Sequence, residues 1–120
     1  MKQKSILLVE DEAITAQSIQ LELQSKGYQV IIAGSSDKAI NAVKSSIPDV
    51  IIMDIHLAGN KDGIETMRSI NEIKNIPVIF MTGYHDELLI ERTKELNLID
   101  IIIKPINLED VYKMLNKNIL

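Results

Sequence analysis

The sequence predicts an α/β protein with a doubly wound sheet of five parallel strands, in the order 2-1-3-4-5, and helices on both faces. Short runs of consecutive apolar residues, such as Val50 to Met53, are typical of strands that are buried on both faces. Strand-like and helix-like segments alternate strictly along the chain, and a crossover helix between each pair of strands indicates a parallel sheet. Right-handed crossovers then place helices on both faces of that sheet.

The first half of the chain contains the first three strands and the two helices between them. Strands are expected over Ser5–Val9 and Tyr28–Ala33, in addition to the strand that ends at Asp54. A helix is expected over Ala13–Lys26, because its apolar residues recur at helical spacing and Gly27 suits a left-handed C-cap. Its apolar residues, all expected to lie in the core, are Ile14, Ile19, Leu21 and Leu23. The N-cap of the next helix is offered by Ser35, Ser36 and Asp37.

A loop and a third helix connect the third strand to the fourth. The loop covers Leu57–Asp62, and its glycine and asparagine are common turn residues. Apolar residues at helical spacing predict a helix over Gly63–Lys74, and Ile73 belongs to its expected core stripe. Pro77 opens the fourth strand, where a missing N–H matters least, and the strand ends at Thr82.

The last part of the chain supplies a fourth helix, the fifth strand and a terminal helix. A helix is expected over Asp86–Leu96, and Asn97 is acceptable as its left-handed cap. The fifth strand is expected over Ile99–Ile103. Asn107 then caps a helix that continues through Leu115.

The composition fits one globular domain over residues 1–120. A chain of 120 residues can bury one core, and 46% hydrophobic with 25% charged residues is ordinary for such a domain. The net charge is −4 and the 13 Lys and Arg residues are scattered, which argues against nucleic acid or an anionic membrane as a partner. No cysteine is present, which excludes disulfides and thiolate chemistry, and the cytoplasm is the default location. The apolar runs are too short to span a membrane.

Polar residues follow four of the strand-like runs. Glu10 and Asp11 follow the first strand, Asp54 closes the third, Thr82 ends the fourth and Lys104 follows the fifth. In open α/β sheets, ligands bind beyond the carboxyl ends of the strands, at the point where the strand order reverses. The predicted order brings the first, third and fifth strands together there, so Glu10, Asp11, Asp54 and Lys104 are expected to converge.

These side chains together predict phosphoryl-transfer chemistry. Three carboxylates at one sheet edge repel one another unless a cation joins them, and a hard divalent ion such as Mg²⁺ prefers oxygen ligands. Lys104 offers a point charge for a phosphate oxygen, and Thr82 offers a hydroxyl donor. A carboxylate nucleophile, a metal, an ammonium and a hydroxyl describe phosphoryl transfer onto Asp54. Acyl transfer lacks a nucleophile, because the chain has no cysteine and no Gly-x-Ser-x-Gly turn.

The joint pattern resembles the receiver domain of two-component response regulators over the whole chain. The segments that carry the resemblance are Glu10-Asp11, Pro48-Asp49 with Met53-Asp54, Ile76 to Thr82, and Lys104-Pro105. The resemblance implies a flavodoxin-like fold in which Asp54 accepts a phosphoryl group from the phosphohistidine of a sensor histidine kinase. It also implies a downstream effector protein, which the sequence does not identify.

The resemblance assigns roles to the residues that match. Asp11 would bind Mg²⁺ directly, Glu10 mainly through water, and His56 through its backbone carbonyl, beside the Asp54 carboxylate. Thr82 and Lys104 would bind the phosphoryl oxygens. The peptide bond between Lys104 and the proline after it would be cis. Such a domain is a signalling phosphoacceptor rather than an enzyme, with weak self-phosphorylation from small donors and weak autodephosphorylation.

The departures from the family pattern concern the switch more than the acceptor site. Ile101 stands where receivers usually carry Tyr or Phe, and Ala58 replaces the usual proline in a loop that looks one residue longer than the commonest form. The resemblance places the output face over the fourth helix, fifth strand and fifth helix, about residues 86–115. A partner or a phosphorylation-dependent dimer is expected there. Tyr84 and the side chain of His56 are expected to shape water access, and so the lifetime of the phosphoryl group.

Two other functions compete with this interpretation. A pseudo-receiver would keep the fold and bind partners without phosphate; Ile101 favours it, whereas the complete set of acceptor-site residues argues against it. A phosphatase of the haloacid-dehalogenase type also uses an aspartyl nucleophile, but it needs a second Asp two residues later, and His56 occupies that position. His56 and His85 are expected to be exposed loop residues rather than side-chain metal ligands, because no second side-chain nitrogen is suitably spaced with either.

Overall fold

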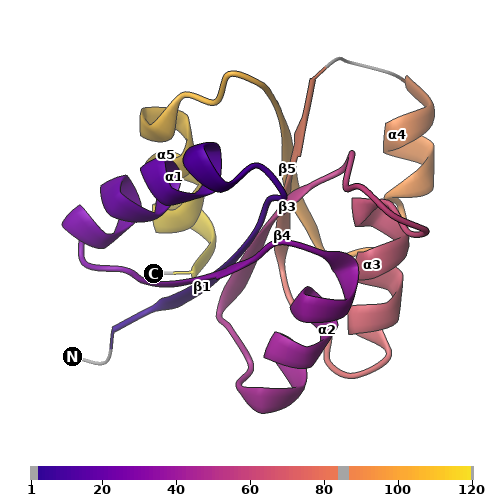
Figure 1. Cartoon of the computed structure of the whole chain (residues 1–120). Helices are drawn as coiled ribbons and strands as arrows, with labels where there is room; N and C mark the ends of the chain where they lie inside the picture. Colours follow the sequence, from indigo (N-terminus) through magenta and orange to yellow (C-terminus); the bar gives the residue numbers. More distant parts are fainter. Residues whose placement is uncertain (1–2, 84–86, 120) are drawn as a thin grey trace.

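The computed structural model describes residues 3–83 and 87–119, and it contains the predicted parallel sheet (Figure 1). The strands are hydrogen-bonded in the order β2-β1-β3-β4-β5, which confirms the predicted fold. The strands are β1 (Ser5–Val9), β2 (Gln29–Ala33), β3 (Val50–Asp54), β4 (Val78–Thr82) and β5 (Leu98–Ile103). The helices are α1 (Ala13–Ser25), α2 (Ser36–Ser45), α3 (Gly63–Asn71), α4 (Glu87–Arg92) and α5 (Leu108–Ile119).

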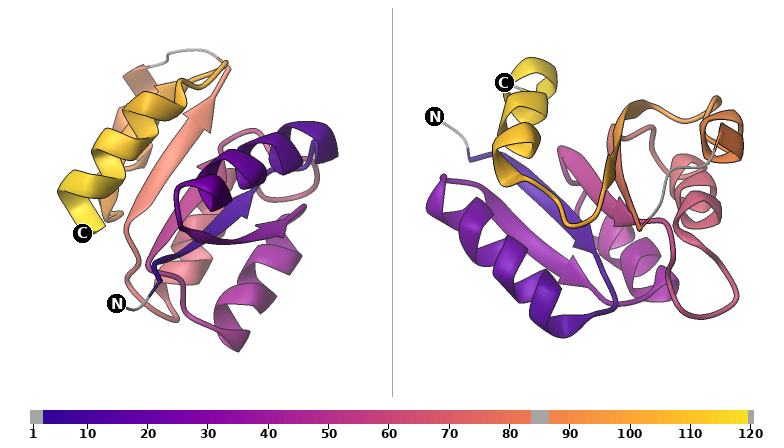
Figure 2. Two further views of the ribbon diagram at one scale, coloured as in Figure 1. Left: turned by 90° about the vertical axis from the view of Figure 1, so that its left-hand side faces the viewer. Right: turned by 90° about the horizontal axis from the view of Figure 1, so that it is seen from above.

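The sheet is the middle layer of three. Helices α1 and α5 cover one face, and α2, α3 and α4 cover the other (Figures 1 and 2). Because successive strand residues point to opposite faces, each strand contributes to two cores. Leu7 and Val9 of β1 pack toward α2 and α3, whereas Ile6 and Leu8 pack toward α1 and α5.

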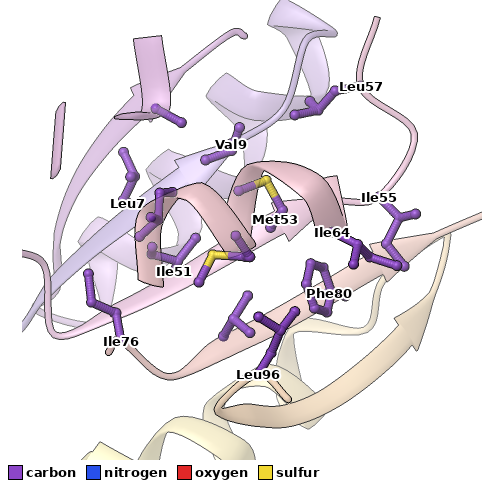
Figure 3. Close-up of a cluster of buried hydrophobic side chains, with 14 of the residues drawn as sticks. Leu7, Val9, Ile51, Met53, Ile55, Leu57, Ile64, Ile76, Phe80 and Leu96 are labelled. Atoms are coloured by element: carbon purple, nitrogen blue, oxygen red, sulfur yellow. The ribbon is translucent and has the colours of Figure 1, made fainter. Parts of the chain in front are cut away.

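Two of the three inner strands, β3 and β4, fix the site because they are buried along their whole length. All five residues of β3 and all five of β4 are buried. On the α3 side, Met53 and Phe80 lie in a cluster of buried side chains that also contains Ile64 of α3 (Figure 3). Each fully buried side chain of this size contributes about 1.5–3 kcal/mol. The carboxyl ends of β3 and β4 are therefore held by strands that are buried along their whole length.

The prediction that every apolar residue of α1 lies in the core is wrong. Ala16, Ile19 and Leu23 are buried, but Ile14 is 80% exposed and Leu21 is 66% exposed. The exposed residues are each two positions away from a buried one, and residues two apart on a helix do not share a face. Ile73 is also exposed, because α3 ends before it.

Several predicted element ends differ from the structure. Helix α3 ends at Asn71 rather than Lys74, and α4 ends at Arg92 rather than Leu96. The Thr93 hydroxyl donates to the carbonyl of Ile90, a local bond that competes with helix continuation. Asn97 is not a left-handed cap, since no described residue other than glycine has a positive φ. The predicted start of α4 at position 86 lies outside the described residues.

The predicted caps elsewhere are confirmed. Gly27 has a φ of +95°, in the left-handed region. The Ser35 side chain accepts a hydrogen bond from the backbone N–H of Lys38 and so caps α2. The Asn107 side chain accepts one from the backbone N–H of Glu109 at the start of α5. Within the described ranges, no helix is long and apolar enough to cross a membrane.

Candidate functional site

Asp54 lies at the carboxyl end of β3, where the central strand leaves the core. It is only 3% exposed, and both of its carboxylate oxygens have partners. The backbone N–H of His56 donates to Oδ1 at 3.0 Å, and the Lys104 ammonium donates to Oδ2 at 3.0 Å. The first bond fixes the carboxylate relative to its own loop, and the second links it to the end of β5.

Lys104 reaches Asp54 from the segment that follows β5. Its backbone N–H donates to the carbonyl of Thr82 at 2.7 Å, which ties this segment to the end of β4. The peptide bond between Lys104 and Pro105 is cis, as the resemblance implies. The ammonium also donates to Oε1 of Glu10 at 2.8 Å, so one cation bridges two buried carboxylates from the ends of β1 and β3.

Burial and charge perturb this group of side chains. Burial raises the pKa of Glu10; the hydrogen bond from Lys104 offsets part of that rise, and the neighbouring Asp54 adds to it. Burial alone would lower the pKa of Lys104, but the hydrogen bonds and charges of Glu10 and Asp54 outweigh it and raise that pKa. Lys104 is therefore held in its charged form at neutral pH.

Asp11 completes an acidic cluster with Glu10 and Asp54. One carboxylate oxygen from each of the three lies within 4.8 Å of the other two. Asp11 is exposed, and its Oδ2 accepts a hydrogen bond from the backbone N–H of Ala58 at 3.0 Å. Three carboxylates and the single ammonium of Lys104 leave a formal charge of −2 (−3 + 1). An all-oxygen donor set with this charge fits a hard divalent cation such as Mg²⁺.

Thr82 ends β4 beside this cluster and is fully buried. Its Oγ1 lies 3.2 Å from Nε2 of His56. The His56 residue is exposed, as predicted for a loop histidine, but its ring contacts this buried hydroxyl. Sequence reasoning missed the contact, because a side-chain direction at a strand end has no signature in the sequence.

The loop that carries His56 is fixed at its far end by Asp62. The Asp62 side chain accepts from the backbone N–H of Glu65 while the Glu65 side chain accepts from the backbone N–H of Asp62, which is a capping box. The other Asp62 oxygen accepts from Arg92 at 2.7 Å, so the start of α3 is joined to the end of α4. Sequence reasoning overlooked both features, although the spacing of Asp62 and Glu65 signals the capping box.

Two residues singled out in the sequence bear on switching. Ile101 pairs with Phe80 in the sheet and packs, half-buried, against the core on the α2–α3 side. Tyr84 lies outside the described residues. The structure thus places the acceptor-site side chains together, whereas the role of each stays a prediction.

Comparison with known proteins identifies the family of this fold and site. Residues 6–116 match the family model described as "Response regulator receiver domain". The chain belongs to this receiver-domain family. Receiver domains are phosphorylation-dependent signalling modules that act with histidine kinases and downstream effectors and bind Mg²⁺ at an acidic pocket.

The curated relatives are longer proteins. The transcriptional regulatory protein AfsQ1 of Streptomyces coelicolor is 29% identical over 102 residues, which are 85% of this chain and 45% of that protein. The transcriptional regulatory protein PdtaR of Mycobacterium tuberculosis is 26% identical over 109 residues, 90% of this chain and 53% of that protein. The chain therefore spans about half the length of the curated relatives that it matches.

Solved structures agree in fold. The N-terminal domain of a response regulator/sensory box/GGDEF 3-domain protein from Carboxydothermus hydrogenoformans has a TM-score of 0.88 at 29% identity, with 97% of this chain and 94% of that chain covered. Chemotaxis protein CheY4 of Vibrio cholerae has a TM-score of 0.90 at 23% identity, with 98% and 99% covered. A CheX-CheY-BeF3-Mg complex from Borrelia burgdorferi has a TM-score of 0.85 at 23% identity, with 95% and 87% covered.

Proposed function

We propose that this receiver domain accepts a phosphoryl group on Asp54 from the phosphohistidine of a sensor histidine kinase, in a Mg²⁺-dependent reaction. The observation that carries the proposal is the Asp54 carboxylate itself. It is nearly buried, it is bonded to the Lys104 ammonium, and it lies in an acidic cluster whose remaining charge matches a divalent cation. A nucleophile, a fixed cation and metal-binding oxygens thus lie at one sheet edge.

In the proposed transfer, an Asp54 carboxylate oxygen attacks the phosphorus atom of the donor. An O–P bond forms, the P–N bond of the phosphohistidine breaks, and its electron pair stays on the imidazole nitrogen of the kinase. Hydrolysis reverses the modification, because attack of water on the acyl phosphate releases inorganic phosphate and restores the Asp54 carboxylate. The domain is thus a signalling phosphoacceptor with weak transfer and hydrolysis activities of its own.

The surrounding residues bind and orient the phosphoryl oxygens in this proposal. Lys104 holds its ammonium beside Asp54 Oδ2 and compensates charge at the oxygen that is modified. Thr82 donates its hydroxyl to a phosphoryl oxygen. Mg²⁺, held by the carboxylates of Glu10, Asp11 and Asp54 and the backbone carbonyl of His56, would supply further charge neutralisation for the transferred group.

Water access to the acyl phosphate sets its lifetime, and we assign that control to His56 and Tyr84. The His56 ring lies 3.2 Å from the Thr82 hydroxyl. The hypothesis for Tyr84 rests on its position two residues after Thr82 in the sequence. The replacement Tyr84→Ala is expected to change the dephosphorylation rate, and an unchanged rate would contradict a role of Tyr84 in water access.

The wider context follows from the same proposal. Residues 1–120 form a single receiver domain, located in the cytoplasm with its kinase. The acidic net charge and the scattered basic residues argue against nucleic acid or an anionic membrane as a partner of this chain. The activity of any longer protein that contains it depends on an effector partner or domain that the chain does not identify.

The output face is proposed to lie over α4, β5 and α5. Ile90 of α4 is 48% exposed and Ile103 of β5 is 49% exposed, so apolar surface is available on this side of the molecule. Phosphorylation biases this face toward a partner or a second copy of the chain. Light scattering with and without beryllofluoride, an acyl phosphate analogue, tests self-association. No change in mass, together with no change in partner binding, would contradict the assignment.

The transfer itself is tested by intact mass after incubation with Mg²⁺ and a small acyl phosphate donor. A single phosphoryl adduct is expected that needs Mg²⁺ and is absent from the Asp54→Asn variant. Absence of both the adduct and Mg²⁺ binding in the unmodified sequence would instead favour the pseudo-receiver, which binds its partners without phosphate.

A further inference from the structure

His56 contacts two residues of the acceptor site, Asp54 through its backbone and Thr82 through its side chain. Its backbone N–H donates to Asp54 Oδ1 at 3.0 Å, and its imidazole Nε2 lies 3.2 Å from Thr82 Oγ1. Asp54 pairs with Met81 in the sheet, so Asp54 and Thr82 end adjacent strands. The imidazole therefore lies against the hydroxyl that is to bind the phosphoryl group.

The backbone on both sides of His56 is held by hydrogen bonds to other segments. The backbone N–H of Ile55 donates to the carbonyl of Met81 at 2.9 Å, and the carbonyl of Ile55 accepts from Gly63 at 2.7 Å. On the other side, the N–H of Ala58 donates to Asp11 at 3.0 Å. These bonds attach the segment around His56 to β4, to the start of α3 and to Asp11. The His56 ring that contacts Thr82 therefore extends from a well-fixed backbone.

The contact matters for switching in the tautomer whose Nε2 carries no proton, in which Nε2 accepts from the Thr82 hydroxyl. A threonine hydroxyl has a single proton to donate. When that proton goes to a phosphoryl oxygen, it is no longer available to the His56 ring. The Thr82 side chain then no longer favours the rotamer that faces the ring. Ile101 has no aromatic ring to couple to this movement, and it packs into the core on the α2–α3 side. The interaction between His56 and Thr82 is thus a local determinant of how readily Thr82 turns toward the phosphoryl group.

We propose that the imidazole of His56 is a positioning residue that holds the Thr82 hydroxyl in the unphosphorylated arrangement and competes with the phosphoryl group for it. The proposal rests on the proposed function, since it assumes that Asp54 carries the phosphoryl group. The contact between the two side chains opposes the phosphorylated arrangement by the free energy of one hydrogen bond. Removing the ring therefore favours the phosphorylated form.

The test measures the affinity of beryllofluoride for the full chain at saturating Mg²⁺, so that differences in metal affinity do not enter the comparison. His56→Ala is expected to bind the analogue about two- to twelvefold more tightly, which is the range that a net hydrogen bond supplies. His56→Gln keeps a side-chain amide that can bond to the hydroxyl, and it is expected to restore the affinity of the unmodified sequence. In a Thr82→Ala background the His56 replacement is expected to have no effect, which isolates the pair.

Each other outcome has a defined meaning. Equal or weaker binding by His56→Ala overturns the proposal, and so does a gain that persists in the Thr82→Ala background. If the unmodified sequence binds beryllofluoride and forms the Asp54 adduct while His56→Ala changes nothing, only this inference fails. If the unmodified sequence does neither, the proposed function fails and this inference fails with it. Urea denaturation of each variant checks that the folded state is retained.

Discussion

Replacement of Gly63 is predicted to destabilise the fold because the start of α3 passes directly over the backbone of the acceptor residue. A Cβ added at Gly63 would lie 2.2 Å from the backbone oxygen of Asp54, 2.9 Å from Cα of Ile55 and 2.9 Å from Cγ of Met53. Two of these three contacts are with backbone atoms, which cannot be relieved by a change of rotamer. Gly63→Ala must therefore displace either the end of β3 or the first turn of α3.

The expected cost follows from this geometry. Overpacking of a well-packed core costs about 1–3 kcal/mol, and a backbone clash belongs at the upper end of that range. Displacement of the helix start also weakens the bond from the Gly63 N–H to the carbonyl of Ile55, now 2.7 Å. We expect a loss of about 3 kcal/mol, which for a urea m-value of roughly 2 kcal/mol/M lowers the unfolding midpoint by about 1.5 M.

Urea denaturation followed by circular dichroism measures this midpoint, and Gly34→Ala is the matched control. A Cβ at Gly34 would have no heavy atom within 4 Å apart from those of Gly34 and its two chain neighbours, and the φ of Gly34 is not in the left-handed region. That variant should change the free energy of unfolding by less than about 1 kcal/mol. If Gly63→Ala unfolds at the same urea concentration as Gly34→Ala, the close approach of α3 to Asp54 is not as the structure describes it.

Two further predictions concern the loop and the acidic cluster. Asp62→Ala should cost about 1–2 kcal/mol at pH 7, the sum of a lost N-cap and a partly exposed ion pair with Arg92, and Asp62→Asn should recover the cap part. Burial would raise the pKa of Asp62, but hydrogen bonds from Glu65 and Arg92 outweigh it and lower that pKa. The stabilisation by the Asp62 carboxylate is therefore present above about pH 4 and is lost as the pH falls through the folded-state pKa. A destabilisation by Asp62→Ala that stays constant down to pH 3 in urea denaturation would contradict this. Mg²⁺ at ten times its Kd should raise the free energy of unfolding by about 1.4 kcal/mol, and Asp11→Asn should reduce that gain at the same Mg²⁺ concentration. An equal gain from an ionic-strength-matched sodium salt would show that the cluster does not bind Mg²⁺ specifically.

The parts of the fold that depend on local pattern could be predicted from the sequence. The apolar run before Asp54 indicates a strand buried on both faces, and all five residues of β3 are buried. Strict alternation of strands and helices indicates a parallel sheet, and the doubly wound order 2-1-3-4-5 places the carboxyl ends of β1, β3 and β5 at one edge, where Glu10, Asp54 and Lys104 lie. Lys104 lies 94 residues from Glu10, and the topology predicts that the two residues lie near each other; their side chains are in contact at 2.8 Å.

The parts that depend on side-chain direction or on pairs of distant helices could not be predicted. Apolar character alone placed Ile14 and Leu21 in the core, but their angular position on α1 puts them on the exposed side. The pairing of Asp62 with Arg92 joins residues 30 positions apart, and it depends on how α3 and α4 lie beside each other. The contact of His56 with Thr82 depends on the path of one loop, which no periodicity encodes.

The position of the acyl phosphate is the most direct test of the central claim that Asp54 is the acceptor. The protein is phosphorylated with a small acyl phosphate and Mg²⁺, reduced with borohydride, digested and sequenced by mass spectrometry. Borohydride converts an aspartyl phosphate to homoserine, and the account predicts homoserine at position 54 and at no other position. Reduction at Asp11 instead, or an adduct that resists borohydride and maps to His56, would contradict the assignment of the acceptor.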